Sequence, residues 1–322
     1  MNTTIFFSKL LLDAFRDTHK VCKYFKLIKL NNYLVIVKIF VIKFFYSFEN
    51  IRNRIKNKKI NNNMRNNSVF IKDINFNINK IINDLDNLGH SKIFELNNKV
   101  RDDLLNLSLE AENFDLNKIK IDKDTKALKK QKDEDIQSYI ARLKNIGISR
   151  LTSTINLNQQ SKLTEFITSP EVLNLARGYL NSDKISINAT FFISNPLKIT
   201  EEEKYKNAQY FHWDNDFTKF FKMYIYLNDV DENTGPHIFV PGTHKNKSIS
   251  NKLCRLYSDE NIKNNYDSFK KFLGKAGSIF FVDGYGIHKG ELPNKNFRLM
   301  MNIHFGRGKI LYSKNDKYIE LK

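Results

Sequence analysis

Cysteine is nearly absent from this sequence, and proline and glycine are scarce. Its 322 residues include two cysteines, Cys22 and Cys254, with five prolines and 12 glycines. Two distant cysteines exclude both a disulfide scaffold and a thiolate metal cluster, and a reducing, cytoplasmic setting is the expectation. The sequence also has no secretory signal and no repeat of solenoid period.

Motifs for nucleic-acid binding are missing as well. There is no zinc-finger spacing, RNP-type aromatic motif or glycine-rich phosphate loop. The net charge is +18. Lysine recurs through the whole chain, and so do the uncharged residues asparagine and isoleucine, which indicates a general compositional bias and not a dedicated basic patch. We therefore expect no nucleic-acid partner.

No apolar run is long enough to span a bilayer. The most apolar segment, residues 33–46, is interrupted by Lys38 and Lys43. It is shorter than the ~20 residues that a spanning helix needs, and each central lysine costs about 3 kcal/mol on insertion. Two alternatives remain: residues 20–60 make peripheral contact with a membrane surface, or they pack on the main domain.

An asparagine-rich break at residues 61–67 is the predicted boundary of an N-terminal helical extension, and Met64 within it is an alternative start. We predict four parts: the basic and apolar extension 1–66, a helical lead-in with a charged connector 67–133, the main domain 134–310, and a C-terminal tail 311–322.

Periodicity changes from helical to alternating along the chain. Apolar spacing predicts helices over 71–88 and 98–107, another from Glu134 to about Gly147, and a helix opened by Ser169-Pro170 as N-cap and first residue. Strands are expected over these segments: 148–155, 185–194, 208–213, 220–227, 237–240, 278–282 and 297–305. Short strands separated by turns indicate an antiparallel sandwich or barrel, with residues 246–275 as an inserted helix or lid.

Within the strand expected at 208–213, a histidine and an aspartate are spaced i, i+2. On a strand His212 and Asp214 would share a face, while Phe211 and Trp213 point away. This spacing also occurs where a strand simply ends in polar residues, so further ligands decide its meaning.

Those ligands lie in the last third of the chain. An apolar strand and a glycine-rich turn lead to His288. Arg298 is the first residue of the final strand, and alternation places Met300, Asn302 and His304 on the same face as Arg298. Two histidines and one carboxylate from separate strands form the facial triad that holds ferrous iron, and an arginine can bind a carboxylate bidentately. Together they indicate a site for iron and a 2-oxo acid.

These motifs, in this order and spacing, resemble the phytanoyl-CoA dioxygenase family over roughly residues 136–308. The resemblance rests on Phe211-His212-Trp213-Asp214, on Asn233-Thr234-Gly235-Pro236 with Val240-Pro241-Gly242-Thr243-His244-Lys245, on Gly277 to Asp283 with His288, and on Arg298 with His304-Phe305. It implies an α+β fold: a double-stranded β-helix, the jelly-roll or cupin-like core, with helices packed outside.

By this resemblance His212, Asp214 and His288 are the iron(II) ligands and Arg298 anchors the cosubstrate 2-oxoglutarate, with O2 as second cosubstrate. The family often has a small hydroxyl residue two places after the second histidine, but here that place is Gly290. Related halogenases lack the carboxylate, so Asp214 favours hydroxylation.

Other polar residues receive weaker assignments. Tyr224 and His304 are candidates for the 2-oxoglutarate pocket, although a core role suits His304 equally. Asn215 and Asp216 are candidates for substrate contact, and turn formation explains them equally well.

Two further histidines receive structural interpretations. His244 follows a Pro-Gly turn and is expected to orient that loop, and His237 is expected to be peripheral.

The predicted function is an iron(II)- and 2-oxoglutarate-dependent dioxygenase that hydroxylates a small or lipid-like metabolite and releases succinate and CO2. The alternatives are a non-catalytic ligand-binding member of the same fold and a basic protein associated with a membrane surface. A small molecule is the expected partner, and the sequence carries no signal of oligomeric state.

Overall fold

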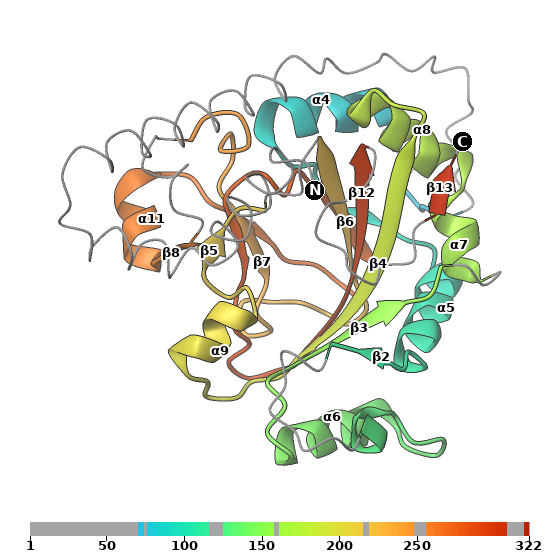
Figure 1. Cartoon of the computed structure of the whole chain (residues 1–322), viewed down its shortest axis with the longest axis vertical. Helices are drawn as coiled ribbons and strands as arrows, with labels where there is room; N and C mark the ends of the chain where they lie inside the picture. Colours follow the sequence, from blue (N-terminus) through green and yellow to red (C-terminus); the bar gives the residue numbers. More distant parts are fainter. Residues whose placement is uncertain are drawn as a thin grey trace, which may run out of the picture.

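Two antiparallel sheets pack against each other at the centre of the protein (Figure 1). The structure is a computed structural model, and it describes residues 70–73, 76–115, 125–157, 161–214, 219–247, 256–307 and 319–321.

The larger sheet carries the long strands. Its order is β1 (Phe94–Glu95), β10 (Ser278–Val282), β6 (Phe220–Tyr226), β12 (Arg298–Arg307), β4 (Ile185–Ser194), β3 (Arg150–Ile155) and β2 (Asn113–Phe114), and β13 (Ile319–Leu321) also pairs with β4. The smaller sheet runs β8 (Leu256–Tyr257), β5 (Phe211–His212), β11 (His288–Gly290), β7 (His237–Phe239) and β9 (Lys270–Phe272). The predicted α+β fold with a jelly-roll core is confirmed.

Strand alternation divides the larger sheet into two chemically different faces. On β12 the odd-numbered Leu299, Met301 and Ile303 pack outward into the main apolar core, together with helix residues. The even-numbered Met300 faces inward, toward the smaller sheet. The predicted sharing of one face by Arg298, Met300, Asn302 and His304 therefore holds, and this inner face is the polar one.

Helices cover the outer face of the larger sheet. Figure 1 shows α4 (Ile78–Leu88), α5 (Asn98–Leu109), α7 (Lys162–Ile167) and α8 (Pro170–Leu180) arranged around it. Their buried apolar side chains, such as Leu85, Leu104 and Leu175, join the same core as β12. The lead-in helices and the main domain thus share one core.

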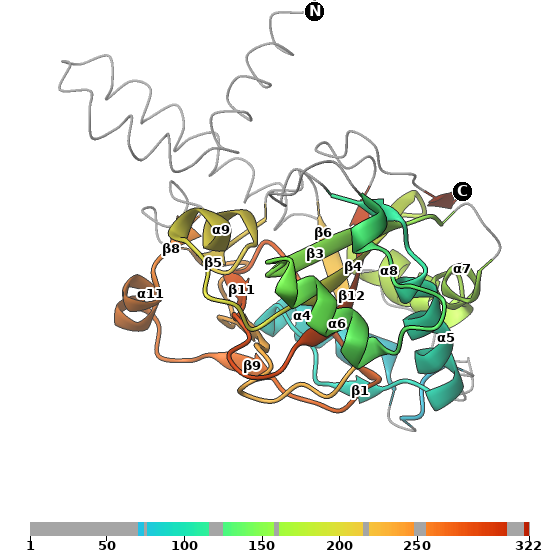
Figure 2. The ribbon, with the colours of Figure 1, turned by 90° about the horizontal axis from the view of Figure 1, so that it is seen from below.

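The remaining short helices lie elsewhere. In Figure 2, α9 (Glu201–Lys206) and α11 (Asp259–Asn265) lie beside the smaller sheet. The 3₁₀ helix η2 (Thr125–Leu128) precedes α6 (Ile136–Asn145), whose Arg142 donates a hydrogen bond to Glu134. The expected insertion at 246–275 contains β8, α11 and β9 in its described part.

Several predicted boundaries were wrong by a few residues. The first helix starts at Ile78 and not at residue 71, because the Asn77 side chain caps it by accepting from the Lys80 amide, while Ile71 pairs with Leu96. Pro170 begins α8 as predicted, but the Ser169 side chain makes no capping hydrogen bond.

The strand expected at 208–213 is also shorter than predicted. It comprises only Phe211–His212, and Ala208 cannot belong to it because its positive φ of 54° is not an extended conformation.

Several predictions concern residues outside the described part. These are the extension 1–66 with its membrane contact at 20–60, the alternative start at Met64, and the substrate candidates Asn215 and Asp216. Among the described residues, no helix combines the length and apolar character that crossing a membrane requires.

Candidate metal centre

Three side chains that suit a metal converge between the sheets. His212 on β5 and His288 on β11 are direct cross-strand partners, and their ring centroids lie 4.4 Å apart. Asp214 Oδ1 is 3.8 Å from His212 Nε2, and Asp214 Oδ2 is 3.4 Å from His288 Nε2. Two ligand atoms bound at right angles to a metal, with bonds of about 2.1 Å, lie about 3 Å apart. The Asp214–histidine distances therefore need to shorten only slightly for all three side chains to bind one ion.

Backbone carbonyls orient both imidazoles. His212 Nδ1 lies 2.9 Å from the Tyr210 carbonyl oxygen, and His288 Nδ1 lies 2.8 Å from that of Gly286. A neutral imidazole that donates from Nδ1 keeps its lone pair on Nε2. Both Nε2 atoms are therefore directed toward Asp214, an orientation that is typical of histidines in protein metal sites.

The turn after β10 holds Asp214 in place. The Asp214 amide donates to the Gly284 carbonyl at 2.8 Å, and a Cβ at Gly284 would lie 2.7 Å from Phe220 and 3.1 Å from Asp214 Oδ2. Only glycine fits this approach without displacement. The neighbouring Asp283 accepts hydrogen bonds from Tyr179 and from the Tyr285 amide, which fixes the turn.

Lys222 compensates the charge of the buried carboxylate. Its Nζ lies 2.5 Å from Asp214 Oδ2. Burial alone would raise the pKa of Asp214, but Lys222 and the two histidines outweigh it and hold that pKa well below its ordinary value. Asp214 is thus an anion ready to bind a cation.

Apolar residues anchor the other face of the same stretch. Phe211 and Trp213 are buried in a separate cluster with Tyr257, and Trp213 Nε1 donates to the Tyr257 hydroxyl at 3.0 Å. The structure shows the predicted alternation, with His212 and Asp214 on one side and Phe211 and Trp213 on the other.

A buried arginine lies at the start of β12. Arg298 is 1% exposed, and within the described residues its Nε and Nη1 have no hydrogen-bond partner. Burial lowers the pKa of Arg298. A buried guanidinium without a carboxylate is costly, which indicates that an anionic ligand belongs beside it.

A second arginine lies in the same row of the sheet. Arg298 and Arg150 both pair in register with Ser194, from either side of β4. Arg150 donates a hydrogen bond to the Asn207 carbonyl, and its guanidinium lies 4.3 Å from the centre of the Phe192 ring. Burial, and then the charge of Arg298, lower the pKa of Arg150 to about 10. This row of the inner face is electropositive.

The family model of phytanoyl-CoA dioxygenase matches residues 97–296. The chain belongs to the phytanoyl-CoA dioxygenase family. The protein is accordingly an iron(II)- and 2-oxoglutarate-dependent dioxygenase. Its donor set of two imidazoles, one carboxylate and a buried arginine fits these groups.

Solved structures of low identity resemble the fold. HygX from Streptomyces hygroscopicus with nickel and 2-oxoglutarate is 10% identical, with 71% of this chain and 86% of that chain covered and a TM-score of 0.47. EctD from S. alaskensis with 2-oxoglutarate and 5-hydroxyectoine is 14% identical, with coverages of 78% and 80% and a TM-score of 0.48. No curated protein matches the sequence. The family assignment rests on the family model.

The weaker cosubstrate candidates lie in different places. Tyr224 on β6 is buried on the inner face, 4.5 Å from the His237 ring, and burial raises its pKa. His304 pairs with Lys222 and packs against Phe220, six residues along β12 from Arg298. That separation is roughly 20 Å along a strand, so His304 lies at the Asp214 end of the site. Both assignments stay predictions.

His237 is the clearest error of the sequence interpretation. It was expected to be peripheral, but it is 2% exposed and its ring lies 5.3 Å from that of His288. Burial, with the nearby charges of His288 and Arg298, lowers its pKa well below the ordinary value. Its place on the face of Phe239, two residues along the strand, was the signal that could have revealed its burial.

His244 has a structural position. Its Nε2 lies 2.9 Å from the Asp86 carbonyl, and the adjacent Gly242 amide donates to the Leu88 carbonyl. These contacts attach the Pro-Gly loop to the end of α4, which supports the predicted role in orienting the loop.

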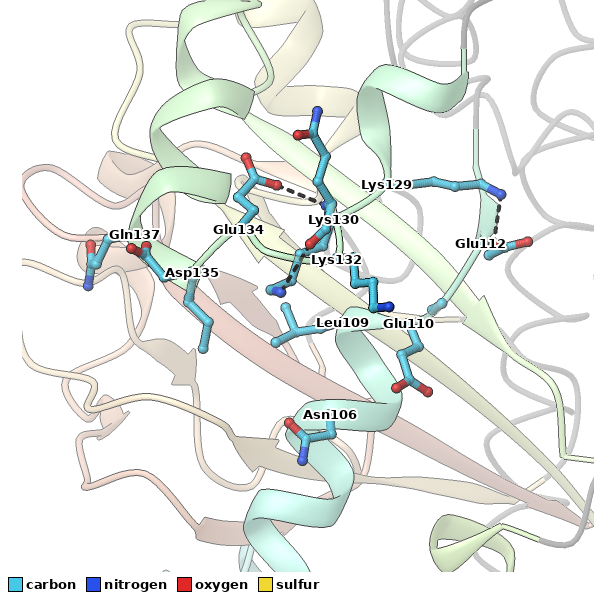
Figure 3. A pocket seen from close by; sticks show the side chains of 13 residues that line it. Asn106, Leu109, Glu110, Glu112, Lys129, Lys130, Lys132, Glu134, Asp135 and Gln137 are labelled. Carbon is cyan, nitrogen blue, oxygen red and sulfur yellow. Dashed lines mark hydrogen bonds and ion pairs between the residues drawn. The ribbon is translucent and has the colours of Figure 1, made fainter.

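A separate hollow of about 750 Å³ lies between the end of α5 and the start of α6. Figure 3 shows that charged and polar side chains line it, and that Lys129 pairs with Glu112 there. None of its lining residues belongs to the metal centre.

Proposed function

We propose that this family member is a hydroxylase in which His212, Asp214 and His288 bind iron(II) and Arg298 binds the distal carboxylate of 2-oxoglutarate. The substrate is a small or lipid-like metabolite, one of whose C–H bonds becomes C–OH. One oxygen atom of O2 enters this alcohol, the other enters succinate, and CO2 is released. The cytoplasmic location expected from the cysteine content belongs to the same proposal.

The observation that carries the proposal is the convergence of the three ligands. Their donor atoms all lie within 4.8 Å of one another. Both imidazoles present Nε2, and the carboxylate is ionised because its pKa is held low. Three protein ligands leave other coordination positions of iron open for the cosubstrate and O2.

The buried arginine supports the second half of the proposal. Arg298 lies on the inner face close to the ligand strand β11: a Cβ at Gly290 would lie 3.0 Å from its Nη2, and Gly290 is two residues from His288. A dicarboxylate that reaches from the metal to Arg298 would pair its far end with the unpartnered guanidinium atoms.

The chain's own residues bind and orient the reactants in this proposal. Iron supplies the activation of oxygen when it is bound. Asp214 and the histidines fix its position, Arg298 selects a dicarboxylate, and the aromatic residues of the inner face exclude water. Among these are Phe192, Tyr226 and Phe280. The presence of Asp214 favours hydroxylation, since a third protein ligand occupies the place that a halide would need.

Uncoupled turnover tests the function. Protein purified without oxygen and then given iron(II), O2 and 2-oxoglutarate should release succinate, and Asp214→Ala should reduce that release at least 100-fold, because it removes a ligand. The Asn106→Ala variant, in the separate hollow, is the matched control and should keep full activity. Failure of the unmodified protein to bind iron(II) would sink the proposal.

A further inference from the structure

His237 is a buried polar residue that neither the metal site nor the core explains. It lies on β7 directly opposite Gly290 of β11, and Phe239 of the same strand is opposite His288. Cross-strand partners share a face, so the His237 side chain lies on the face of the metal ligand His288. Ile238, between them in sequence, packs in the opposite cluster.

The imidazole of His237 has an unsatisfied nitrogen. Its ring lies 4.5 Å from that of Tyr224 and 5.8 Å from those of Phe272 and Phe280. Among the described residues, Nε2 meets no hydrogen-bond partner. A buried nitrogen of this kind is destabilising unless a ligand satisfies it.

His237 lies between the metal ligands and Arg298. Gly290, its cross-strand partner, has no side chain, and a Cβ there would come within 3.0 Å of Arg298 Nη2. On the other side the His237 ring is 5.3 Å from the His288 ring. A molecule that bridges the metal and Arg298 therefore passes His237.

We propose that His237 is a binding residue for 2-oxoglutarate, whose imidazole donates a hydrogen bond from Nε2 to the carboxylate that Arg298 binds. This inference rests on the proposed function. The distal carboxylate then receives donors from two sides, the guanidinium from β12 and the imidazole from β7. Because position 290 carries no side chain, the imidazole reaches this carboxylate unobstructed.

The test measures 2-oxoglutarate binding without turnover. Nickel(II) replaces iron, and isothermal titration calorimetry under argon gives the dissociation constants of 2-oxoglutarate and of 2-oxobutyrate, which lacks the distal carboxylate. His237→Phe keeps a ring but removes the donor, so its affinity for 2-oxoglutarate should fall about tenfold or more. Its affinity for 2-oxobutyrate and for nickel should stay within about threefold.

Two further variants complete the design. His237→Gln retains a donor and should recover most of the affinity for 2-oxoglutarate. His90→Phe is the matched control: His90 is also a buried histidine, 5.7 Å from the Phe239 and Phe272 rings, but it is not opposite Gly290. It should bind 2-oxoglutarate as the unmodified protein does. If His237→Phe does not fold, the smaller His237→Met takes its place.

Three outcomes overturn the inference. Unchanged 2-oxoglutarate affinity in folded His237→Phe rejects it while leaving the proposed function intact. An equal loss for both 2-oxo acids rejects the contact with the distal carboxylate. Absence of 2-oxoglutarate binding in the unmodified nickel-loaded protein rejects the proposed function as well.

Discussion

Lys222 Nζ lies 2.5 Å from Asp214 Oδ2, and both side chains are largely buried. The lysine therefore neutralises the carboxylate that we propose as a metal ligand. In the metal-free protein this ion pair is the main compensation for a buried negative charge.

Replacement of Lys222 should destabilise the metal-free protein more than the metal-loaded protein. Lys222→Met leaves Asp214 with less compensation, and removal of one partner of a buried pair costs about 3–5 kcal/mol. Nickel(II) or iron(II) supplies a new positive charge, so it should restore a large part of the lost free energy of unfolding. Urea unfolding of both proteins, with and without metal, measures this. A loss of the same size in the presence of metal would contradict the assignment of Asp214 as ligand.

The low pKa of Asp214 predicts an acid-dependent loss of stability. The carboxyl of an unfolded chain titrates near 3.9, and the folded value lies well below it. Between these values the unfolded chain binds more protons, so this contribution is full above pH about 5 and declines as the pH falls. The difference in unfolding free energy between the metal-free protein and Asp214→Asn should therefore shrink below pH about 4. Urea titrations from pH 6 to pH 3 test it, and a constant difference is the opposing result.

Arg298 and Arg150 should differ in their effect on the cosubstrate. Arg298→Gln removes the buried cation that binds the distal carboxylate of 2-oxoglutarate in our proposal, so it should weaken 2-oxoglutarate binding at least 30-fold. Arg150→Met should have a smaller effect, because Arg150 already donates to the Asn207 carbonyl and stacks on Phe192. Calorimetry on the nickel-loaded variants compares them. A larger effect of the Arg150 substitution would show that Arg150, and not Arg298, is the residue that binds the distal carboxylate.

The Gly284 contact predicts a loss of metal affinity from a single methyl group. Gly284→Ala places a Cβ 2.7 Å from Phe220 and 3.1 Å from Asp214 Oδ2, and such overpacking costs about 1–3 kcal/mol. The displaced carboxylate should weaken nickel binding about tenfold. Gly242→Ala, whose φ is 78° with nothing within 4 Å, is the control. It should lose stability through backbone strain and keep its metal affinity, as shown by titration with nickel.

The sequence predicted correctly which side chains share a face wherever all of those residues lie within one short segment. Alternation along β12 predicted the common face of Arg298 and His304, and the spacing of His212 and Asp214 predicted that these two side chains lie on one side. The family motifs then supplied His288. These features are local, so they need no knowledge of how the sheets pack.

Contacts that depend on packing between the sheets were missed. The sequence predicts a peripheral His237 because no motif supplies a partner for it, whereas its burial comes from Tyr224, Phe272 and Phe280 on other strands. The ion pair of Lys222 with Asp214 likewise depends on the turn at Gly284, which sets the distance between the two elements. Neither contact can be predicted from the local sequence pattern, because each joins residues on different elements.

The pairing of His212 with His288 has a consequence for the folding of the smaller sheet. β5 and β11 make a short ladder, and the chain between these two residues includes all of β6 and β10 of the larger sheet. An ion bound to both histidines would act as a cross-link that closes this long loop, much as a disulfide does. Iron loading should then slow the global unfolding of the domain, so the catalytic ion would also protect the protein against proteolysis.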